Sequence, residues 1–174
     1  MDGLVWIFAY GSLMWRPGFA YRAFEPALLE GWHRALCVYS YIYRGSPAHP
    51  GLVLGLDRGG RCHGRAIGIA PEREREVLAY LDQRELVTDV YRRMRLPVRL
   101  CRAGRMVEAW CYVVRRDHEQ YAGVLPRDEL LRLVRRGAGR AGSCRDYVLN
   151  TLAHLREMGI REPHLEAVAV ALEE

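Results

Sequence analysis

The sequence predicts an α+β fold, in which short strands curl into a small mixed or antiparallel β-barrel with flanking helices and a helical C-terminal tail. Three observations support this prediction. Six or more strand-like segments with hairpin signals occupy the first two thirds of the chain, one helix is inserted among them, and the last third is helical in pattern. Because strands and helices do not alternate regularly, the pattern excludes a Rossmann-type fold.

The first strands are predicted from apolar and aromatic runs that end at turn residues. Residues 4–8 form a short apolar run, and residues 28–43 alternate, with aromatic and β-branched side chains throughout. Glycine, serine and proline then interrupt the pattern. Residues 52–56 and 62–69 predict two further strands, joined by a hairpin at the DRGG segment of residues 57–60.

A helix follows, and then a second pair of strands. Residues 72–86 have helical spacing, and Pro71 occupies a favourable position at the helix start. Residues 91–101 and 106–114 alternate again, with Gly104 in the turn between them. These segments complete the strands of the predicted barrel.

The remaining chain predicts three helices and no strand. They cover residues 126–134, 144–158 and 163–172. Gly159 supplies a C-cap after the second helix, and Pro163 opens the third. This is the helical tail of the α+β prediction.

At 174 residues the chain is long enough to bury a substantial core, and we expect a single domain over residues 1–174. No linker-like or low-complexity tract divides it. No apolar stretch reaches the roughly 20 residues of a membrane-spanning helix, and the N-terminus lacks the pattern of a signal peptide. We therefore expect a cytoplasmic protein with no membrane partner.

The chain is basic, with 26 lysine and arginine residues, 21 acidic residues and a net charge of +5. One interpretation is an anionic partner, such as nucleic acid or a phosphorylated ligand. The other is the solvated surface of an arginine-rich protein, which we favour because the basic residues are dispersed among Asp and Glu. We expect no nucleic-acid partner. The one cluster comprises Arg132, Arg135, Arg136 and Arg140.

Cysteine and histidine spacing gives no sign of a disulfide framework or of a metal site. The five cysteines are odd in number and form no CxxC pair, so we expect reduced thiols. The six histidines form no HExxH or similar motif, and we expect no metal. The cysteines are Cys37, Cys62, Cys101, Cys111 and Cys144.

One carboxylate in the predicted helix of residues 72–86 stands out. Placing residues 100° apart puts Glu85 on the same stripe as Leu78 and Leu81. A carboxylate on an apolar face is costly to ionise, so its pKa rises, which suits a group that takes and returns a proton near neutral pH. Alternatively, the helix frays and Glu85 reaches water or pairs with Arg84. Glu74 is the rival carboxylate, but the helix dipole is sufficient to explain an acid in the first turn.

A second feature is the loop YGSL, residues 10–13, which ends the first apolar strand. Glycine allows a tight backbone and the close approach of a ligand to it. Successive N–H groups in such a turn form a concavity suited to a carboxylate or an oxyanion. No GK[ST] follows, so a nucleotide phosphate is not indicated. The alternative is a plain turn.

Motifs along nearly the whole chain resemble one family. YGSL at residues 10–13 is followed by MWRP, and RGSP at residues 44–47 is followed by PGLVL at residues 50–54. CHG at residues 62–64 and YLDQRE at residues 80–85 come next, and the likeness continues into the helical tail. In this order they resemble the ChaC-type γ-glutamylcyclotransferase family, in its bacterial branch. YGSL alone is a weak signal, but YGSL joined to YLxxRE at this distance is specific.

The resemblance implies one γ-glutamylcyclotransferase-like domain that cleaves glutathione to 5-oxoproline and Cys-Gly, with no metal or organic cofactor. The substrate's own α-amine attacks its γ-carbonyl. The family's catalytic glutamate corresponds to Glu85, which would take the amine proton and pass it to the departing nitrogen. Tyr91 lies where the bacterial branch keeps a tyrosine. The substrate-binding loop corresponds to Ala9, Tyr10, Gly11, Ser12 and Leu13.

Some positions depart from the family pattern or leave a role open. Ala9 replaces a common glycine, which we expect to be tolerated if its φ is not positive. Cys144 stands where asparagine is common, so a polar contact there is open. Tyr91 either donates a hydrogen bond to substrate or is a core tyrosine. Arg44 either faces the glycine carboxylate of glutathione or lies on the surface. The loop N–H groups bind either the α-carboxylate or the oxyanion.

Two other functions compete with glutathione cleavage. The first is a cyclotransferase for another γ-glutamyl amine or dipeptide, which would use the same Glu85. The second is a non-catalytic γ-glutamyl-binding or anion-binding protein. We favour an enzyme, because a protein that only binds a substrate carboxylate gains nothing from a nearby buried acid.

Overall fold

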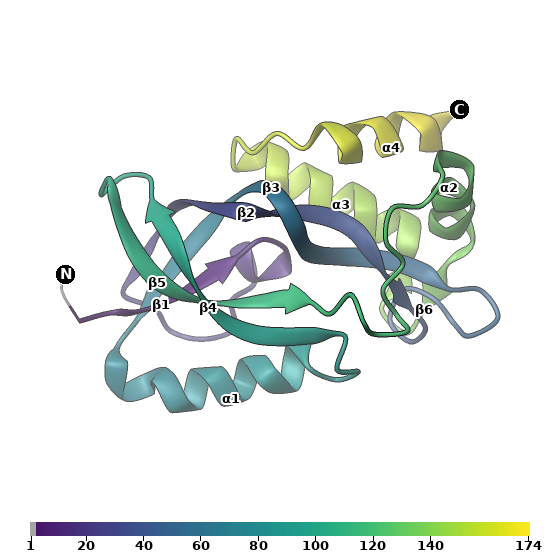
Figure 1. Cartoon of the computed structure of the whole chain (residues 1–174). Helices are drawn as coiled ribbons and strands as arrows, with labels where there is room; N and C mark the ends of the chain where they lie inside the picture. Colours follow the sequence, from purple (N-terminus) through teal and green to yellow (C-terminus); the bar gives the residue numbers. More distant parts are fainter. Residues whose placement is uncertain (1–2) are drawn as a thin grey trace. The chain divides into compact units, whose positions relative to one another are not determined.

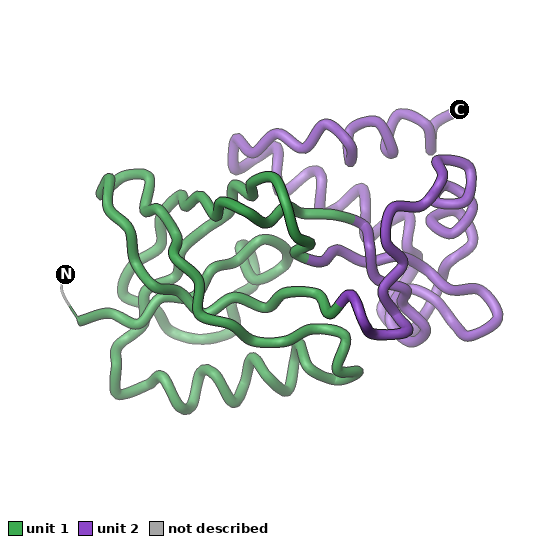
Figure 2. Tube along the Cα trace, in the orientation of Figure 1, with its two compact units in different colours: residues 1–35, 56–115 green, residues 36–55, 116–174 purple. Residues whose placement is uncertain are grey.

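The computed structural model describes residues 3–174 (Figure 1). The chain divides into two compact units: the first contains residues up to 35 together with 56–115, and the second contains 36–55 together with 116–174 (Figure 2). Two strands run from one unit into the other. A single domain over residues 1–174 therefore stays a prediction, and its residues 1–2 lie outside the described part.

Within residues 3–174 five strands form a closed barrel, which confirms the α+β barrel predicted from the sequence. The order around the barrel is β1-β3-β2-β4-β5. The sheet is mixed, because β1 pairs antiparallel with β3 and parallel with β5. The strands are β1 (Val5–Ala9), β2 (Ala23–Ser40), β3 (Gly51–Ile69), β4 (Tyr91–Leu100) and β5 (Arg105–Val114).

Alternation along the strands produces the barrel core. Trp6 and Phe8 are two residues apart in β1, and both are buried against side chains from the other strands. Cys111 and Val113 repeat the pattern in β5. Cys111 is thus a buried core thiol, whereas Cys101 is exposed. The other buried members of this cluster are Ala27, Leu29, Leu56, Cys62, Ala66, Val98, Leu100 and Ala109.

The hairpin predicted at residues 57–60 is wrong. The chain continues through this segment as one strand, β3, instead of reversing. Gly59 and Gly60 have φ values of 98° and 67°, so they take the left-handed backbone that a hairpin turn would also need. Positive-φ glycine inside a strand marks a bulge or bend, and here it lies within the long β3.

The predicted helix at residues 72–86 is confirmed, although its first turn is a separate 3₁₀ turn. Pro71–Arg73 forms this turn, and α1 then covers Glu74–Glu85. Its buried side chains are Val77, Leu78 and Leu81, which is the apolar stripe expected from the sequence.

Polar contacts attach α1 to the barrel near both of its ends. The indole N–H of Trp110, in β5, donates to Glu74 in the first turn over 2.9 Å. Near the other end, Asp82 accepts from Arg93 of β4 over 2.6 Å and from the Tyr112 hydroxyl of β5 over 2.7 Å. The last turn of α1, which carries Glu85, is thus fixed against the sheet.

The second unit contains the three predicted helices, but the prediction of no strand after residue 114 is wrong, because residues 138–139 and 142–143 pair as two short antiparallel strands. Its three helices contact one another within the described residues. The Ser143 hydroxyl accepts from the Asp146 N–H over 3.0 Å as an N-cap, and Gly159 has a φ of 70° after the second of these helices. The elements are α2 (Arg127–Arg136), α3 (Cys144–Glu157) and α4 (Pro163–Glu173), with a short β6 (Ala138–Gly139) and β7 (Gly142–Ser143).

Close backbone packing in the second unit explains its glycine motifs. A Cβ at Gly45 would overlap the Ser40 carbonyl, and one at Gly51 would overlap the Arg44 carbonyl. The RGSP and PGLVL motifs therefore have a structural role in bringing two stretches of backbone together.

Cys144 makes the polar contact that the sequence left open at this position. Its thiol donates to the Leu52 carbonyl over 3.1 Å and accepts from the Leu52 N–H over 3.2 Å. Burial raises the pKa of the Cys144 thiol, so the group stays protonated and able to donate. The first residue of α3 is thereby bonded to β3.

All five cysteines lie within residues 3–174, and none of them forms a disulfide there. In the same residues, no cluster of three or more metal-ligating His, Cys, Asp or Glu side chains occurs. None of the helices described is long and apolar enough to span a bilayer.

We predict that Cys144→Ala lowers the free energy of unfolding by about 1–3 kcal/mol, because it leaves both backbone groups of Leu52 without this partner. Cys144→Ser should lose less, since a hydroxyl also donates and accepts. Chemical denaturation of the three proteins measures the difference. The control is Cys111→Ala, which removes an equally buried thiol whose contact, to Ala109, lies within its own strand. Equal losses at Cys144 and Cys111 would contradict the role of the Leu52 contact.

Candidate active site

The loop of residues 10–13 begins where β1 ends at Ala9 and turns directly into a short 3₁₀ helix, Ser12–Met14. Leu13 and Met14 are buried in this helix, which explains the apolar character of the loop. Among residues 3–174, the only non-glycine residue with positive φ is Asp89. Ala9 therefore has no positive φ, which is the condition under which we expected alanine to be tolerated at this position.

Two glycines near the loop have different surroundings. A Cβ added at Gly11 would meet no atom within 4 Å, so the protein itself leaves that space open. A Cβ at Gly64, in the CHG motif, would overlap the Ala9 carbonyl and the Phe8 ring. Gly64 is thus required by packing against β1, whereas Gly11 has no neighbour that requires it.

A buried arginine supports the loop from the barrel side. Arg34, in β2, is 1% exposed. Its Nε donates to the Tyr10 carbonyl over 2.6 Å, and its second terminal nitrogen donates to the His63 carbonyl over 2.7 Å. The guanidinium fork therefore connects the end of β1 with β3 and fixes the direction of the Tyr10 carbonyl.

A second arginine supports the loop from α1. The guanidinium of Arg84 donates to the Ser12 hydroxyl over 2.6 Å and to the Arg16 carbonyl over 2.8 Å. Its Nε also lies 3.5 Å from a carboxylate oxygen of Glu85. Through this one side chain the structure brings together the predicted loop and the helix end that carries the predicted base.

Glu85 is the last residue of α1, so the helix does not fray before it. Its side chain is 22% exposed. Burial raises the pKa of Glu85, and the neighbouring Arg84 guanidinium opposes this by favouring the charged form. The upward direction of the Glu85 pKa shift, which was predicted from the apolar stripe of the helix, is confirmed. The alternative, a contact with Arg84, is also present.

The remaining candidates near Glu85 have defined positions. Tyr91 is the first residue of β4 and is partly buried, opposite Val114 of β5. Its proposed hydrogen bond to substrate stays a prediction. Glu74, the rival carboxylate, accepts from Trp110 in the first turn, so its contact is structural.

Arg44 lies in the second unit and contacts residues of that unit. Its guanidinium is 5.3 Å from the centre of the Tyr147 ring, and it donates to the Ser143 carbonyl over 3.3 Å. Tyr147 in turn accepts from the Leu54 N–H over 3.0 Å. These contacts give Arg44 a role within the unit, and its contact with a substrate carboxylate stays a prediction.

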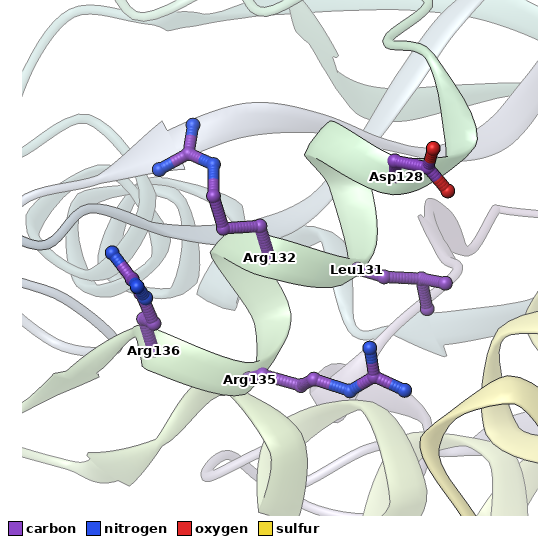
Figure 3. Close-up of a pocket in the computed structure, with 5 residues that line it drawn as sticks. All are labelled: Asp128, Leu131, Arg132, Arg135 and Arg136. Carbon is purple, nitrogen blue, oxygen red and sulfur yellow. The ribbon is translucent and has the colours of Figure 1, made fainter. Parts of the chain in front are cut away.

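A hollow of about 330 Å³ lies along α2 in the second unit (Figure 3). It is lined by part of the arginine cluster, but Arg132 and Arg136 extend to one side of the helix and Arg135 to the other (Figure 3). Arg135 donates to the Ala171 carbonyl over 2.6 Å. The side chains do not converge, and none of the predicted site residues lines this hollow.

Sequence reasoning assigned no role to Arg34 and none to Arg84 beyond a partner for Glu85. Arg34 lies in β2 two residues from the buried Leu36, so alternation would have placed a cation on the inner face of the strand. Such a residue signals a functional or structural contact, because burying a charge is costly. The contact of Arg84 with Ser12 spans 72 residues and leaves no local signal.

Comparison with solved structures identifies the class of fold. A crystal structure of a yeast γ-glutamylcyclotransferase specific to glutathione matches with a TM-score of 0.86 at 22% identity, and the match covers 99% of this chain and 96% of that one. At this identity the likeness establishes the fold. The chain therefore has the γ-glutamylcyclotransferase fold.

Comparison of sequences identifies the family. The model for ChaC-like proteins matches residues 5–174. The Escherichia coli glutathione-specific γ-glutamylcyclotransferase is 31% identical over 98% of this chain and 74% of its own length. The human glutathione-specific γ-glutamylcyclotransferase 1 is 29% identical over 97% of this chain and 78% of its own length. The chain belongs to the ChaC-like family.

We predict that Glu85→Gln stabilises the fold at neutral pH and has a smaller effect near about pH 4. Because folding raises the pKa of Glu85, its contribution favours folding when the carboxyl is protonated and is lost as pH rises through the folded pKa. Glutamine removes the cost of the buried charge. Denaturation midpoints of both proteins at the two pH values test this.

Glu76→Gln is the matched control, since Glu76 lies on the same helix but is exposed. A hydrogen bond from Arg73 lowers the pKa of Glu76, so its contribution is present above its unfolded pKa and lost as pH falls. The control should therefore give no gain or a slight loss at neutral pH. The same response from both variants would contradict the burial of the Glu85 charge.

Proposed function

We propose that this protein is a γ-glutamylcyclotransferase that cleaves glutathione to 5-oxoproline and Cys-Gly. The observation that carries the proposal is the partly buried Glu85, whose raised pKa suits proton transfer and whose neighbour Arg84 bonds to the loop of residues 10–13. The choice of glutathione is supported by the E. coli and human relatives that are named for it. A small molecule is thus the proposed partner.

In the proposed mechanism the substrate reacts with itself. The neutral α-amine nitrogen attacks the γ-carbonyl carbon, so a carbon–nitrogen bond closes the five-membered ring and an oxyanion forms. Glu85 accepts the proton that this nitrogen loses. It then gives the proton to the nitrogen of the cysteine of glutathione as the γ-glutamyl amide bond of the substrate breaks. Glu85 ends the cycle as it began, and no oxidant or second substrate is needed.

The loop of residues 10–13, together with Ala9 before it, holds the γ-glutamyl end of the substrate in this mechanism. The open space at Gly11 supports this role, because a ligand there would approach the backbone without a side chain between them. Arg34 fixes the Tyr10 carbonyl behind the loop, so the loop is rigid on its protein side. A preorganised backbone of this kind can hold the folded, reactive shape of the substrate.

We also propose a cytoplasmic location. The cysteines of this protein form no disulfide in the described residues, and reduced thiols suit a reducing compartment.

The first test is release of 5-oxoproline from glutathione by the wild-type protein and by Glu85→Gln. We expect the variant to lose at least about a hundredfold in turnover, because glutamine cannot carry the proton. Its fold and its affinity for glutathione should be largely kept, since glutamine matches glutamate in shape. Circular dichroism and calorimetric titration measure these two properties.

The control is Glu72→Gln, an exposed acid just before α1 that pairs with Arg22. It should leave turnover unchanged. Near-wild-type turnover in Glu85→Gln would reject the catalytic assignment. If the wild-type protein releases nothing from glutathione, a panel of other γ-glutamyl amines and dipeptides decides between a different substrate and a binding protein.

We predict that Gly11→Ala folds normally but loses about tenfold or more in kcat/KM for glutathione. The added methyl group meets no protein atom, so the loss would come from crowding of the substrate. Gly64→Ala is the contrasting variant, since its Cβ overlaps the Ala9 carbonyl, and it should lose stability instead. Thermal unfolding and steady-state kinetics separate the two. Full activity in Gly11→Ala would show that the substrate does not approach this backbone.

A further inference from the structure

Arg84 makes contacts that a surface arginine does not need. Its side chain is 24% exposed, and its terminal nitrogens bond to Ser12 and to the Arg16 carbonyl at two points of one loop. One of these nitrogens also reaches the Tyr80 hydroxyl, one turn earlier in α1, at 3.5 Å. The guanidinium is therefore fixed from both the helix and the loop.

The same guanidinium lies beside the proposed base. Arg84 Nε is 3.5 Å from Glu85 and favours its charged form, against the effect of burial. One cation thus contacts both the loop proposed to hold the substrate and the carboxylate proposed to move the proton.

The other charged side chains named around this end of α1 are bonded elsewhere or exposed. Asp82 is bonded to Arg93 of β4 and to Tyr112 of β5. In the loop, the Arg16 side chain is exposed, and the Tyr10 carbonyl accepts from the buried Arg34. Arg84 is the cation whose charge acts on Glu85.

We propose that Arg84 is a positioning residue, which fixes the loop of residues 10–16 against the end of α1 and orients the Glu85 carboxylate beside it. This rests on the proposed function only where turnover is concerned. The contact of Arg84 with the loop belongs to the structure whatever the reaction is.

The geometry accounts for arginine at this position. Several N–H groups in a planar fork serve Ser12, the Arg16 carbonyl and Glu85 at once. A lysine would keep the charge near Glu85 but offers a single ammonium group, which cannot reach all three partners in fixed directions. Arg84→Lys therefore separates orientation from charge, and Arg84→Gln removes both.

The first readout does not depend on activity. We predict that Arg84→Gln raises the hydrogen-exchange rate of the amides of residues 10–16 by about tenfold, because the loop loses two of its contacts with α1. The matched control is Arg75→Gln, which removes the same charge from an exposed position of the same helix. Exchange in residues 10–16 that is equal in the two variants would overturn the proposal.

The second readout is the pH profile of kcat/KM with glutathione. Arg84→Gln should lose about tenfold to a hundredfold in kcat/KM, and the acidic limb should move to higher pH, since the cation that favours charged Glu85 is gone. Arg84→Lys should keep the limb near its wild-type pH and still lose kcat/KM. An unmoved limb in Arg84→Gln would contradict the effect of Arg84 on the charge of Glu85.

A double variant tests whether Ser12 acts through Arg84. Ser12→Ala alone should reduce kcat/KM less than Arg84→Gln, because the bond to the Arg16 carbonyl remains. Added to Arg84→Gln, it should have no further effect. Additive losses would overturn the coupling. If the wild-type protein cleaves no γ-glutamyl compound, the proposed function fails, and hydrogen exchange alone still decides whether Arg84 positions the loop.

Discussion

The partial burial of one carboxylate is the constraint on which this site depends. Glu85 ends α1 on the stripe of Leu78 and Leu81, where its charge is costly and its pKa is raised. A helix end that moved freely would expose the group to water and remove the shift. The contacts of Glu74 with Trp110, and of Asp82 with Arg93 and Tyr112, fix the helix to the barrel. The barrel thus determines the environment of the carboxylate.

The loop of residues 10–13 meets this helix end through arginines. Arg34 bonds to the Tyr10 carbonyl from within the barrel, and Arg84 bonds to Ser12 from α1. Backbone carbonyls accept from both guanidinium groups, so part of their desolvation cost is offset by charge-assisted hydrogen bonds. Two rigid supports on a short loop are what a site needs if its backbone is to hold a substrate in one reactive shape.

Much of this could be predicted from the sequence, because local patterns encode it. The stripe in α1 identified Glu85 and the direction of its pKa, and alternation identified β4 and β5. The Gly59-Gly60 pair gave the wrong hairpin prediction, because glycines with positive φ suit both a hairpin turn and a bend inside a strand. Only the pairing with neighbouring strands decides between these two structures.

The arginine contacts could not be predicted in this way. Arg34 reaches a carbonyl 24 residues away and Arg84 a hydroxyl 72 residues away, so neither contact has a spacing that a local pattern reveals. The polar contact at Cys144 is similar, because its partner Leu52 lies 92 residues away. The partners of such long-range hydrogen bonds come within reach of each other only in the folded protein.

In the proposed mechanism, Glu85 is the group whose protonation controls catalysis. This role is tested most directly by titrating the Glu85 side-chain carboxyl in the free wild-type protein by NMR and comparing its titration curve with the pH profile of kcat/KM for glutathione. Since kcat/KM reports the ionisations of the free enzyme and the free substrate, the acidic limb of the profile should share its midpoint with the Glu85 titration, above the ordinary range for glutamate. A Glu85 carboxyl that titrates in the ordinary range, or away from the limb of the profile, would contradict the account.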